Sequence, residues 1–328
     1  MQELDHDCVK AFSESLCRGG TYEFKYKRRT GEDKADGLCM FWNKSRWKCV
    51  HYDDLEFYRY DDDPLMDRHN VAQIGVLKEL SSENVIVVAN THLLFNPKRG
   101  DVKLRQLEIL LTSISNVCKK FHKPDVCVLL MGDFNAVPGS AMYELLSNGR
   151  LSLRNLDRKL ISGQWNPKTM HEWDEIKWAF DSRHLGRGTC MRVFRTERTE
   201  GERKSELRSS SDGIDFDVED KDEKNLLKHE LSLQSAYAES PSLRSTGEPA
   251  FTTYHSRFKG TVDYIWYGSG LNRTRVLEMI PKTILDRFRG LPSSKWSSDH
   301  MSLCAEFEFS SSSSPSVKQH KNSVWPSL

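Results

Sequence analysis

Hydrophobic residues along the first half of the chain form two patterns, continuous runs and helical repeats. The run Val-Ile-Val-Val-Ala-Asn-Thr-His-Leu at residues 85–93 and the shorter run at residues 126–131 each predict a buried strand. Between these runs, Asp101 precedes hydrophobic residues at helical spacing and is predicted to cap an amphipathic helix that includes Val102, Leu107, Leu110, Leu111, Ile114, Val117, Cys118 and Phe121. The alternation of strands and helices predicts a layered α/β domain.

Further elements follow from local composition. Ser140 is predicted to cap a short helix that ends near Gly149. Four other segments, rich in aromatic and β-branched residues, predict strands at residues 22–26, 38–42, 261–267 and 301–309. No internal repeat is visible, which disfavours solenoids and propellers.

Two segments lack the apolar residues that a packed core needs. Between residues 196 and 224, charged residues and serine replace hydrophobic ones, so we expect a disordered charged insertion there. A run of serines opens residues 310–328, which we expect to form a disordered tail. The remaining sequence is predicted to make up one domain over residues 1–309.

The overall charge excludes a broadly basic nucleic-acid binder. The chain has 48 Lys and Arg against 47 Asp and Glu, a formal net charge of +1, so any site for a polyanion must be a local groove. No stretch approaches the roughly 20 apolar residues that span a bilayer, and we expect a soluble protein without membrane association. The 8 cysteines contain no Cys-X-X-Cys pair and indicate reduced thiols. With no signal peptide visible, we expect the protein in the cytoplasm, the nucleus or both.

Acidic, amide and imidazole residues gather at the ends of the predicted strands: His92, Asp133, Asn135, Asp263 and the pair Asp299-His300. Strand ends can converge on one edge of a sheet, and carboxylate and carboxamide oxygens are hard ligands that suit magnesium or manganese better than zinc. Each residue alone has a simpler structural interpretation, such as a turn after a strand or a buried, hydrogen-bonded acid. Repeated acids beside apolar strands make convergence on a cation the better hypothesis.

Four motifs in this order, Thr-His92-Leu, Gly-Asp133-Phe-Asn135, Thr-Val-Asp263-Tyr-Ile and Ser-Asp299-His300, resemble the endonuclease/exonuclease/phosphatase superfamily. Residues 90–104 and 258–266 narrow the resemblance to the carbon-catabolite-repressor-type deadenylases with their Angel and nocturnin relatives, and are similar to plant members. The resemblance implies an α+β four-layer sandwich, in which two mixed β-sheets pack face to face with helices outside.

The resemblance also implies roles for acids and an amide. Glu3 corresponds to a glutamate that binds magnesium after a Leu-Gln-Glu motif, and Asp133 would orient or deprotonate the attacking water. Asn135 would position the phosphate. Asp263 would help to hold a metal or orient a catalytic partner.

Histidines and a base-binding pair complete the implied site. His92 and His300 would donate to phosphate oxygens, with Asp299 fixing the His300 ring. Pro97 and Phe258 match positions that sandwich an adenine base, and Asn96 adjoins them as a further substrate-binding residue; stacking on a base contributes about 1–3 kcal/mol.

Three basic residues at the start of the predicted helix, Lys98, Arg99 and Lys103, allow two interpretations. They either guide the RNA backbone or form a solvated face of the helix start. The sequence alone leaves both interpretations open.

The implied reaction is magnesium-dependent (or manganese-dependent) 3′-to-5′ removal of poly(A) tails from RNA with release of 5′-AMP. Two alternatives stay open: a phosphatase acting on RNA 2′,3′-cyclic phosphates or on a nucleotide, and a non-catalytic RNA-binding remnant. The expected partner is the 3′ poly(A) end of RNA, and no leucine-rich-repeat docking module is evident.

The position of Glu3 leads to one more expectation. The family carries an asparagine at the end of a first strand, well upstream of the Leu-Gln-Glu motif, whereas this sequence begins two residues before Glu3. We therefore expect an N-terminally truncated domain that lacks its first strand and helix and is impaired in activity.

Overall fold

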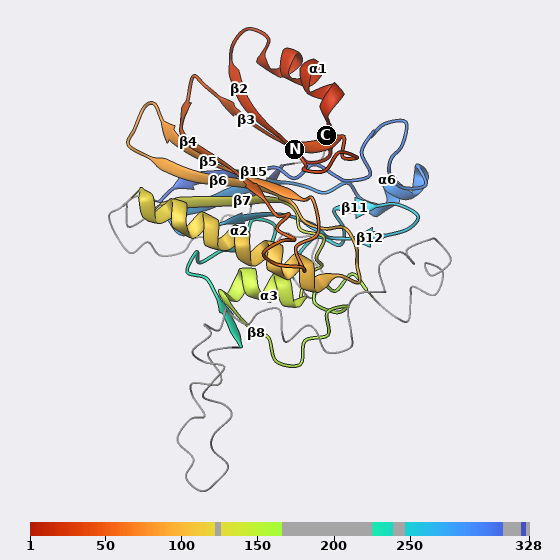
Figure 1. Cartoon of the computed structure of the whole chain (residues 1–328). Coiled ribbons are helices and arrows are strands. Elements are labelled where there is room, and N and C mark those ends of the chain that lie inside the picture. The colour runs from red at the N-terminus through yellow and green to blue at the C-terminus, as the bar shows by residue number, and fades with distance from the viewer. Residues whose placement is uncertain (122–125, 166–224, 239–246, 311–322, 326–328) are drawn as a thin grey trace, which may run out of the picture.

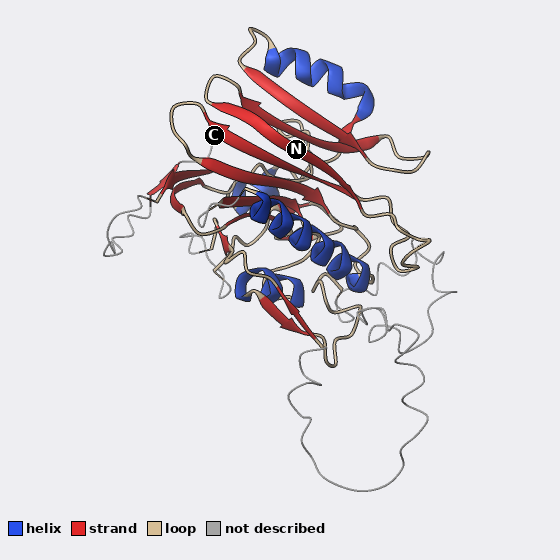
Figure 2. Ribbon diagram, turned by 60° about the vertical axis from the view of Figure 1, so that its left-hand side comes forward, coloured by secondary structure: helices blue, strands red, loops and turns tan. Residues whose placement is uncertain are grey.

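The computed structural model describes residues 1–121, 126–165, 225–238, 247–310 and 323–325. Its central element is a six-stranded sheet with the order β10-β13-β7-β6-β5-β4 (Figures 1 and 2). Strands β6 and β7 are parallel, and the other neighbours are antiparallel. The bounds are β4 Trp47–Glu56, β5 Val71–Glu79, β6 Val85–His92, β7 Cys127–Asp133, β10 Gln234–Ser235 and β13 Asp263–Tyr267.

Two three-stranded sheets form a second layer on one face of the six-stranded sheet. Trp42 of the second layer shares a hydrophobic cluster with Ile86 and Val88 of β6 and with Leu271 of the other small sheet. The sheets therefore pack as a sandwich. One small sheet has the order β1-β3-β2 and the other β15-β14-β16, with the bounds β1 Leu4–Asp5, β2 Tyr22–Arg28, β3 Asp36–Asn43, β14 Leu271–Leu277, β15 Ala305–Phe309 and β16 Ser323–Trp325.

Helices cover the outside of both layers (Figures 1 and 2). Helices α2 (Gly100–Lys120) and α3 (Ala141–Asn148) lie against the other face of the six-stranded sheet. There Leu107 and Leu110 join Val87 and Ala89 in the largest hydrophobic cluster. Helix α1 (His6–Cys17) lies outside β2 and buries none of its residues. This arrangement confirms the predicted α/β sandwich of sheets with helices outside.

Short elements extend the sheets at the edge where the candidate site lies. The hairpin β11 (Thr253–Tyr254) and β12 (Lys259–Gly260) packs with α6 (Lys282–Arg287) around a small cluster formed by Phe251, Tyr254, Leu285, Leu291 and Met301. A second two-stranded sheet pairs β8 (Arg150–Ser152) with β9 (Leu226–Lys228). In the described part of the chain, no helix has both the length and the apolar character needed to cross a membrane.

The predicted start of the long helix is wrong by two residues. Helix α2 begins at Gly100 with Arg99 as its N-cap residue, and no side chain caps it. Asp101 instead lies in the first turn, where its Oδ1 accepts a hydrogen bond from Arg99 Nε at 3.1 Å. An acid in the first turn stabilises the helix through its dipole without capping it. The predicted cap of α3 is confirmed, because Ser140 Oγ accepts from the Tyr143 N–H and Gly149 ends the helix at φ 69°.

The structure describes the two segments predicted to be disordered to different extents. The charged insertion at residues 196–224 lies outside the described residues. Within the tail predicted over residues 310–328, Ser323–Trp325 form β16 and pair in parallel with β14. The edge of β14 offers backbone groups that an extended segment of this kind can pair with. Disorder of the tail stays a prediction.

Candidate active site

The ends of three neighbouring strands bring the predicted residues together. In the sheet register, His92 at the end of β6 stands opposite Asp133 at the end of β7, and Asp133 stands opposite Asp263 at the start of β13. Side chains alternate along a strand, so these residues share the face of Val88, Met131 and other residues between the sheets. The site therefore lies at one end of the sandwich.

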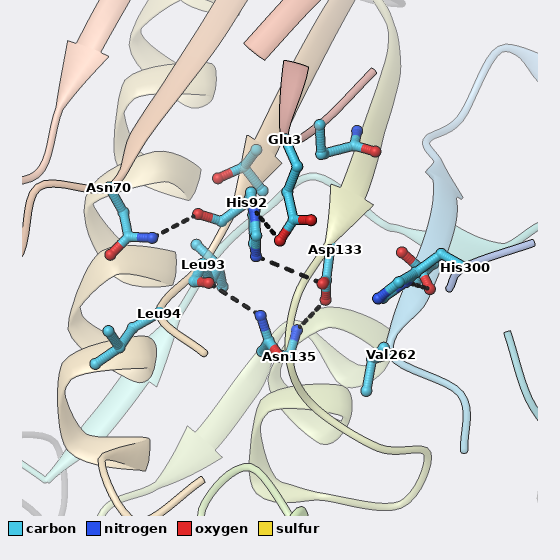
Figure 3. Close-up of polar contacts among 12 residues, drawn as sticks. Glu3, Asn70, His92, Leu93, Leu94, Asp133, Asn135, Val262 and His300 are labelled. Atoms are coloured by element: carbon cyan, nitrogen blue, oxygen red, sulfur yellow. Dashed lines mark hydrogen bonds and ion pairs between the residues drawn. The ribbon is translucent and has the colours of Figure 1, made fainter. Parts of the chain in front are cut away.

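Acids and imidazoles form two linked pairs there (Figure 3). His300 Nδ1 lies 2.8 Å from Asp263 Oδ2, and the hydroxyl of Thr252 donates to the same oxygen at 2.6 Å. His92 Nε2 lies 3.5 Å from Asp133 Oδ2. Ligand atoms of Asp133, Asp263 and His300 all lie within 4.8 Å of one another.

The charges of these groups depend on each other. Burial and the negative charge of Asp263 raise the pKa of Asp133 to about 6, while His92 and His300 act in the opposite direction. Burial disfavours the charged form of His300, but the hydrogen bond and charge of Asp263, with the charge of Asp133, raise its pKa to about 10. At neutral pH the site therefore holds an imidazolium beside a carboxylate that can still accept a proton.

The turn after β7 holds Asp133 and Asn135 in fixed positions. Gly132 has φ 146°, and a Cβ on it would lie 1.9 Å from the carbonyl oxygen of Thr91, so only glycine fits. Asn135 takes the left-handed conformation at φ 48°. Its backbone N–H donates to Asp133 Oδ1 at 2.8 Å and its amide Nδ2 to the carbonyl of Leu93 at 3.1 Å (Figure 3).

A chain of amides holds the backbone around His92. Asn70 Nδ2 donates to the carbonyl of His92 at 3.0 Å, and Gln106 of α2 donates to Asn70 Oδ1 at 3.2 Å. The Gln106 side-chain oxygen in turn accepts from the Leu94 N–H at 2.9 Å. The long helix therefore holds the end of β6, where His92 lies, and the start of the loop that follows it.

Glu3 lies beside His92. Its Oε1 is 3.8 Å from His92 Nδ1, and its side chain is 63% exposed (Figure 3). The close cluster of possible metal-binding groups among the described residues consists of Asp133, Asp263 and His300, and does not include Glu3. The role of Glu3 as a metal ligand stays a prediction.

The partner predicted for His300 is wrong. Asp263, from the neighbouring strand, holds His300 Nδ1, rather than Asp299. The Asp299 carbonyl accepts from Thr253 Oγ1 at 2.8 Å, and the charge of the Asp299 side chain helps to raise the pKa of His300. Asp299 was predicted as the partner because it is adjacent in sequence. The backbone of His300 forms a β-bridge with Thr253, and its ring faces Asp263 of β13.

The predicted base-binding residues lie on two loops at this edge of the sheet. Asn96 and Pro97 follow β6, and Asn96 Oδ1 accepts from the Lys98 N–H at 2.9 Å in the turn that leads into α2. Phe258 is half-buried at the tip of the β11–β12 hairpin, where its ring covers Gly260. The stacking of an adenine between Pro97 and Phe258 stays a prediction.

Lys103 and Arg99, two of the three basic residues at the helix start, neither guide an RNA backbone nor form a solvated face of the helix. Lys103 is fully buried, and its Nζ donates to the carbonyl of Asn135 at 2.8 Å. Arg99 is buried and bonded to Asp101. Of the three, only Lys98 is accessible enough to contact an RNA backbone. Its Nζ lies 4.1 Å from the ring centre of Trp165. Burial lowers the pKa of Lys103 to about 7, whereas the negative charges of Asp133 and Asp101 act to raise it.

Sequence reasoning missed two groups that contact the site. The Thr252 hydroxyl donates to Asp263, and the Lys103 amino group donates to the backbone carbonyl of Asn135. The sequence does carry one signal for Lys103, which lies four residues before Leu107 and seven before Leu110, on the helix face that is predicted to be buried. No sequence pattern of this kind identifies Thr252 as a residue of the site.

The donor chemistry of the site fits a hard divalent cation. Asp133 and Asp263 offer carboxylate oxygens, and Mg²⁺ commonly takes one or two carboxylates together with water and substrate phosphate. His300 does not suit the role of ligand, because its Nδ1 is held by Asp263 and the raised pKa keeps the ring protonated. Two carboxylates with no thiolate beside them among the described residues suit magnesium better than zinc.

Comparison with known proteins places this geometry in a family. Residues 1–300 match the Endonuclease/Exonuclease/phosphatase family. The chain is 34% identical over 316 residues to Carbon catabolite repressor protein 4 homolog 3 of Arabidopsis thaliana, in a match that covers 94% of the chain and 64% of that relative. The chain thus spans slightly less than two thirds of the length of this relative.

Two solved structures share the fold. ANGEL2, described as a 2′,3′-cyclic phosphatase in complex with adenosine-2′,3′-vanadate, matches at 32% identity and a TM-score of 0.69, over 93% of this chain and 80% of the other. The catalytic domain of human nocturnin with bound sulfate matches at 20% identity and a TM-score of 0.55, over 94% of this chain and 79% of the other. With its motifs, its sandwich of sheets and its family match in agreement, the chain belongs to the endonuclease/exonuclease/phosphatase family.

Proposed function

We propose that this chain is a magnesium-dependent hydrolase that acts on phosphate esters at the 3′ end of RNA. The observation that carries the proposal is the cluster of Asp133, Asp263 and His300, whose ligand atoms all lie within 4.8 Å of one another. Attack of water on phosphorus needs a base for the water and positive groups for the phosphate oxygens, and this cluster offers both.

Asp133 is the general base in this proposal. Its pKa of about 6 leaves the carboxylate mostly ionised at neutral pH and still able to accept a proton from water. The Asn135 N–H holds Asp133 Oδ1. The oxygen Oδ2, which faces His92, is therefore the one we assign to the attacking water.

His300 stabilises negative charge on the phosphate. Asp263 holds the Nδ1 side of the ring, so Nε2 is the atom directed to the substrate. A pKa of about 10 keeps the ring charged throughout the neutral range. A fixed cation of this kind stabilises the transition state more than the ground state, because negative charge grows on the phosphate oxygens during attack.

A magnesium ion, when bound, would neutralise phosphate charge and stabilise the leaving oxygen. We propose that Glu3 and Asp263 hold it, Asp263 through Oδ1, since His300 and Thr252 already occupy Oδ2. Manganese offers the same coordination chemistry and is expected to substitute.

Poly(A) is the first candidate substrate. The loops that carry Pro97 and Phe258 follow β6 and precede β13, the two strands that carry His92 and Asp263 into the site. A base stacked between such residues would bring a terminal adenosine phosphodiester to Asp133. Successive cleavage would then release 5′-AMP.

A 2′,3′-cyclic phosphate at the RNA end is the second candidate. The likeness to ANGEL2, which extends over 93% of this chain, favours it. A cyclic phosphate presents the same phosphorus and oxygens to His300 and Asp133, but it needs no stacked base to define the scissile bond.

One product analysis distinguishes the candidates. The chain is incubated with magnesium and 5′-labelled RNA ending in 20 adenosines, with either a 3′-hydroxyl or a 2′,3′-cyclic phosphate. A ladder of shortened RNA with 5′-AMP supports poly(A) removal, and loss of the cyclic phosphate at full length supports the second candidate. Asp133→Asn, which keeps the side-chain shape, should abolish either activity. If the chain leaves both RNAs intact, the proposed hydrolase is rejected.

The non-catalytic alternative has its own test. Calorimetric titration with Mg²⁺ should show binding that Asp263→Asn weakens, because a carboxylate ligand is lost. A chain that binds the RNA while showing no carboxylate-dependent Mg²⁺ binding would be an RNA-binding remnant.

A further inference from the structure

Lys103 is a buried amino group that the proposed reaction does not use. It projects from α2 beneath the turn after β7, with no exposed surface. Its Nζ donates to the Asn135 carbonyl at 2.8 Å, to Ser162 Oγ at 3.3 Å and to Gln164 Oε1. Three acceptor oxygens match the three N–H bonds of an ammonium group.

A directed chain of hydrogen bonds connects Lys103 with the Asn135 side chain. Lys103 donates to Gln164 Oε1, and Gln164 Nε2 donates to Asn135 Oδ1 at 3.1 Å. Asn135 Nδ2 then donates to the Leu93 carbonyl at 3.1 Å. Nδ2 carries a second N–H, and no partner for it is found among the described residues.

The direction of this chain is fixed at both ends, by Lys103, which donates to Gln164, and by the Leu93 carbonyl, which can only accept from Asn135. An amide side chain can turn by half a rotation and exchange its oxygen and nitrogen at little cost in shape. In its ammonium form, which the charges of Asp133 and Asp101 favour, Lys103 has no acceptor, so only the oxygen of Gln164 can face it. The nitrogen of Gln164 must then face Asn135, which leaves only the oxygen of Asn135 as its partner.

We propose that Lys103 is a positioning residue that sets the orientation of the Gln164 and Asn135 amides, so that Asn135 presents an N–H rather than an oxygen to the substrate phosphate. This inference rests on the proposed hydrolysis of a phosphate ester at this site. An amide turned the wrong way would direct a carbonyl oxygen at phosphate oxygens and repel them.

Gln164→Glu tests the orientation without emptying the site. A carboxylate still accepts from Lys103 and adds an ion pair to it, so the free energy of unfolding should be unchanged or higher. It cannot donate to Asn135, whose amide is then expected to turn its nitrogen toward the new carboxylate and its oxygen toward the substrate. We expect kcat to fall by about 100-fold, the order of effect of losing one transition-state donor, with a smaller change in KM.

Two further variants separate orientation from packing. Ser162→Ala removes another acceptor of Lys103 that has no bond to the Asn135 amide, and should change kcat less than about threefold if orientation is what matters. Lys103→Met keeps the length of the side chain and removes the donor, and should lower kcat as Gln164→Glu does. An equal loss of kcat in Ser162→Ala and Gln164→Glu would overturn the inference.

A spectroscopic measurement separates this inference from the proposed function. In protein labelled with 15N-asparagine, inorganic phosphate with Mg²⁺ should shift the Asn135 side-chain amide signal, identified by its absence in Asn135→Asp. Gln164→Glu should abolish that shift. If Gln164→Glu abolishes the shift but the chain hydrolyses neither RNA, the proposed hydrolase function is rejected and the positioning role of Lys103 is kept. A hydrolytically active chain whose Asn135 signal responds equally with and without Gln164→Glu would reject the inference alone.

Discussion

Asp133 and His300 show how two side chains a few ångströms apart acquire opposite chemistry. Burial and a neighbouring acid raise the pKa of Asp133 to about 6, whereas Asp263 raises the pKa of His300 to about 10. Separated pKa values of this kind assign a base and a cation to one site. Asp263 acts on both, so its single substitution should change the charge of each.

The first prediction concerns activity and pH. Because the pKa of Asp133 is raised to about 6, its protonated form persists to higher pH than that of an ordinary aspartate, and kcat/KM should fall below pH about 6. The positive charge of His300 lowers this pKa. His300→Gln removes that charge, so the acid limb of the residual activity should move to higher pH. A limb that stays in place would show that Asp133 is not the titrating base.

The second prediction concerns the ionisation of His300. In Asp263→Asn, the hydrogen bond to a carboxylate is lost and burial dominates, so the His300 pKa should fall from about 10 toward or below its ordinary value of 6.5. An NMR titration of histidine ring protons, without metal, measures the change. The remaining histidine signals of the same spectra serve as the control. A His300 signal that titrates near pH 10 in the variant would contradict the assignment of Asp263 as its partner.

The same shift affects stability. The folded-state pKa of His300, about 10, exceeds the ordinary value of 6.5, so its stabilising contribution is complete below about pH 6.5 and is lost as the pH rises through about 10. Between pH 7 and pH 10, the free energy of unfolding in urea should therefore decline more in the wild type than in Asp263→Asn. Comparing the two proteins cancels the titration of groups that they share.

At the scale of elements, the strands that carry the site were predictable because both of their faces are covered. β6 and β7 lie between α2 and the second sheet layer, so Val87 and Val88 are both buried on opposite faces and the sequence shows an unbroken apolar run. β4 has one face toward solvent and polar residues through its length, and α1 buries nothing, so neither produced a recognisable pattern.

The site was predictable to the extent that its residues terminate such strands. His92, Asp133 and Asp263 follow or begin apolar runs, and the register brings them together. The groups that hold these residues and Asn135 come from other parts of the chain. Thr252, from the segment before β11, holds Asp263; Gln164, from the segment after β8, holds Asn135; and Asn70, from the loop before β5, holds the His92 carbonyl. Contacts between elements distant in the chain depend on how the layers pack, which local pattern does not reveal.

The third prediction tests the turn that joins β7 to the site. Gly132→Ala adds a Cβ 1.9 Å from the Thr91 carbonyl at a φ of 146°, so β6 and β7 must separate where His92 and Asp133 face each other. We expect a loss of more than about 3 kcal/mol in the free energy of unfolding, or no folded protein. Gly139→Ala is the control, since its φ of 76° is also strained but nothing lies within 4 Å of the added Cβ. Equal losses in the two variants would show that the close approach to Thr91 does not matter.

At the scale of the molecule, the site depends on how the two sheet layers are held together. Three amide residues bridge them in the otherwise apolar interior. Asn90 of β6 accepts from Gln2 Nε2 at 2.6 Å and donates to Gln73 Oε1 at 3.1 Å. Gln73 of β5 donates to the Lys25 carbonyl of β2 at 2.9 Å. The bridge adjoins the site, since Gln2 precedes Glu3 and Asn90 lies two residues before His92.

The last prediction tests whether this bridge aligns the layers. Asn90→Ala leaves Gln73 Oε1 and Gln2 Nε2 without the Asn90 amide as partner, which should cost about 1–3 kcal/mol of unfolding free energy. Hydrogen exchange should accelerate at the backbone of β1 and β3, because the second layer loses a polar anchor while the six-stranded sheet keeps its own ladder. Asn84→Ala is the control, since Asn84 bonds Glu79 within one hairpin of the six-stranded sheet. If Asn90→Ala lowers stability but leaves exchange in β1 and β3 unchanged, the apolar cluster around Trp42 alone holds the layers, and Glu3 keeps its place beside His92 without the bridge.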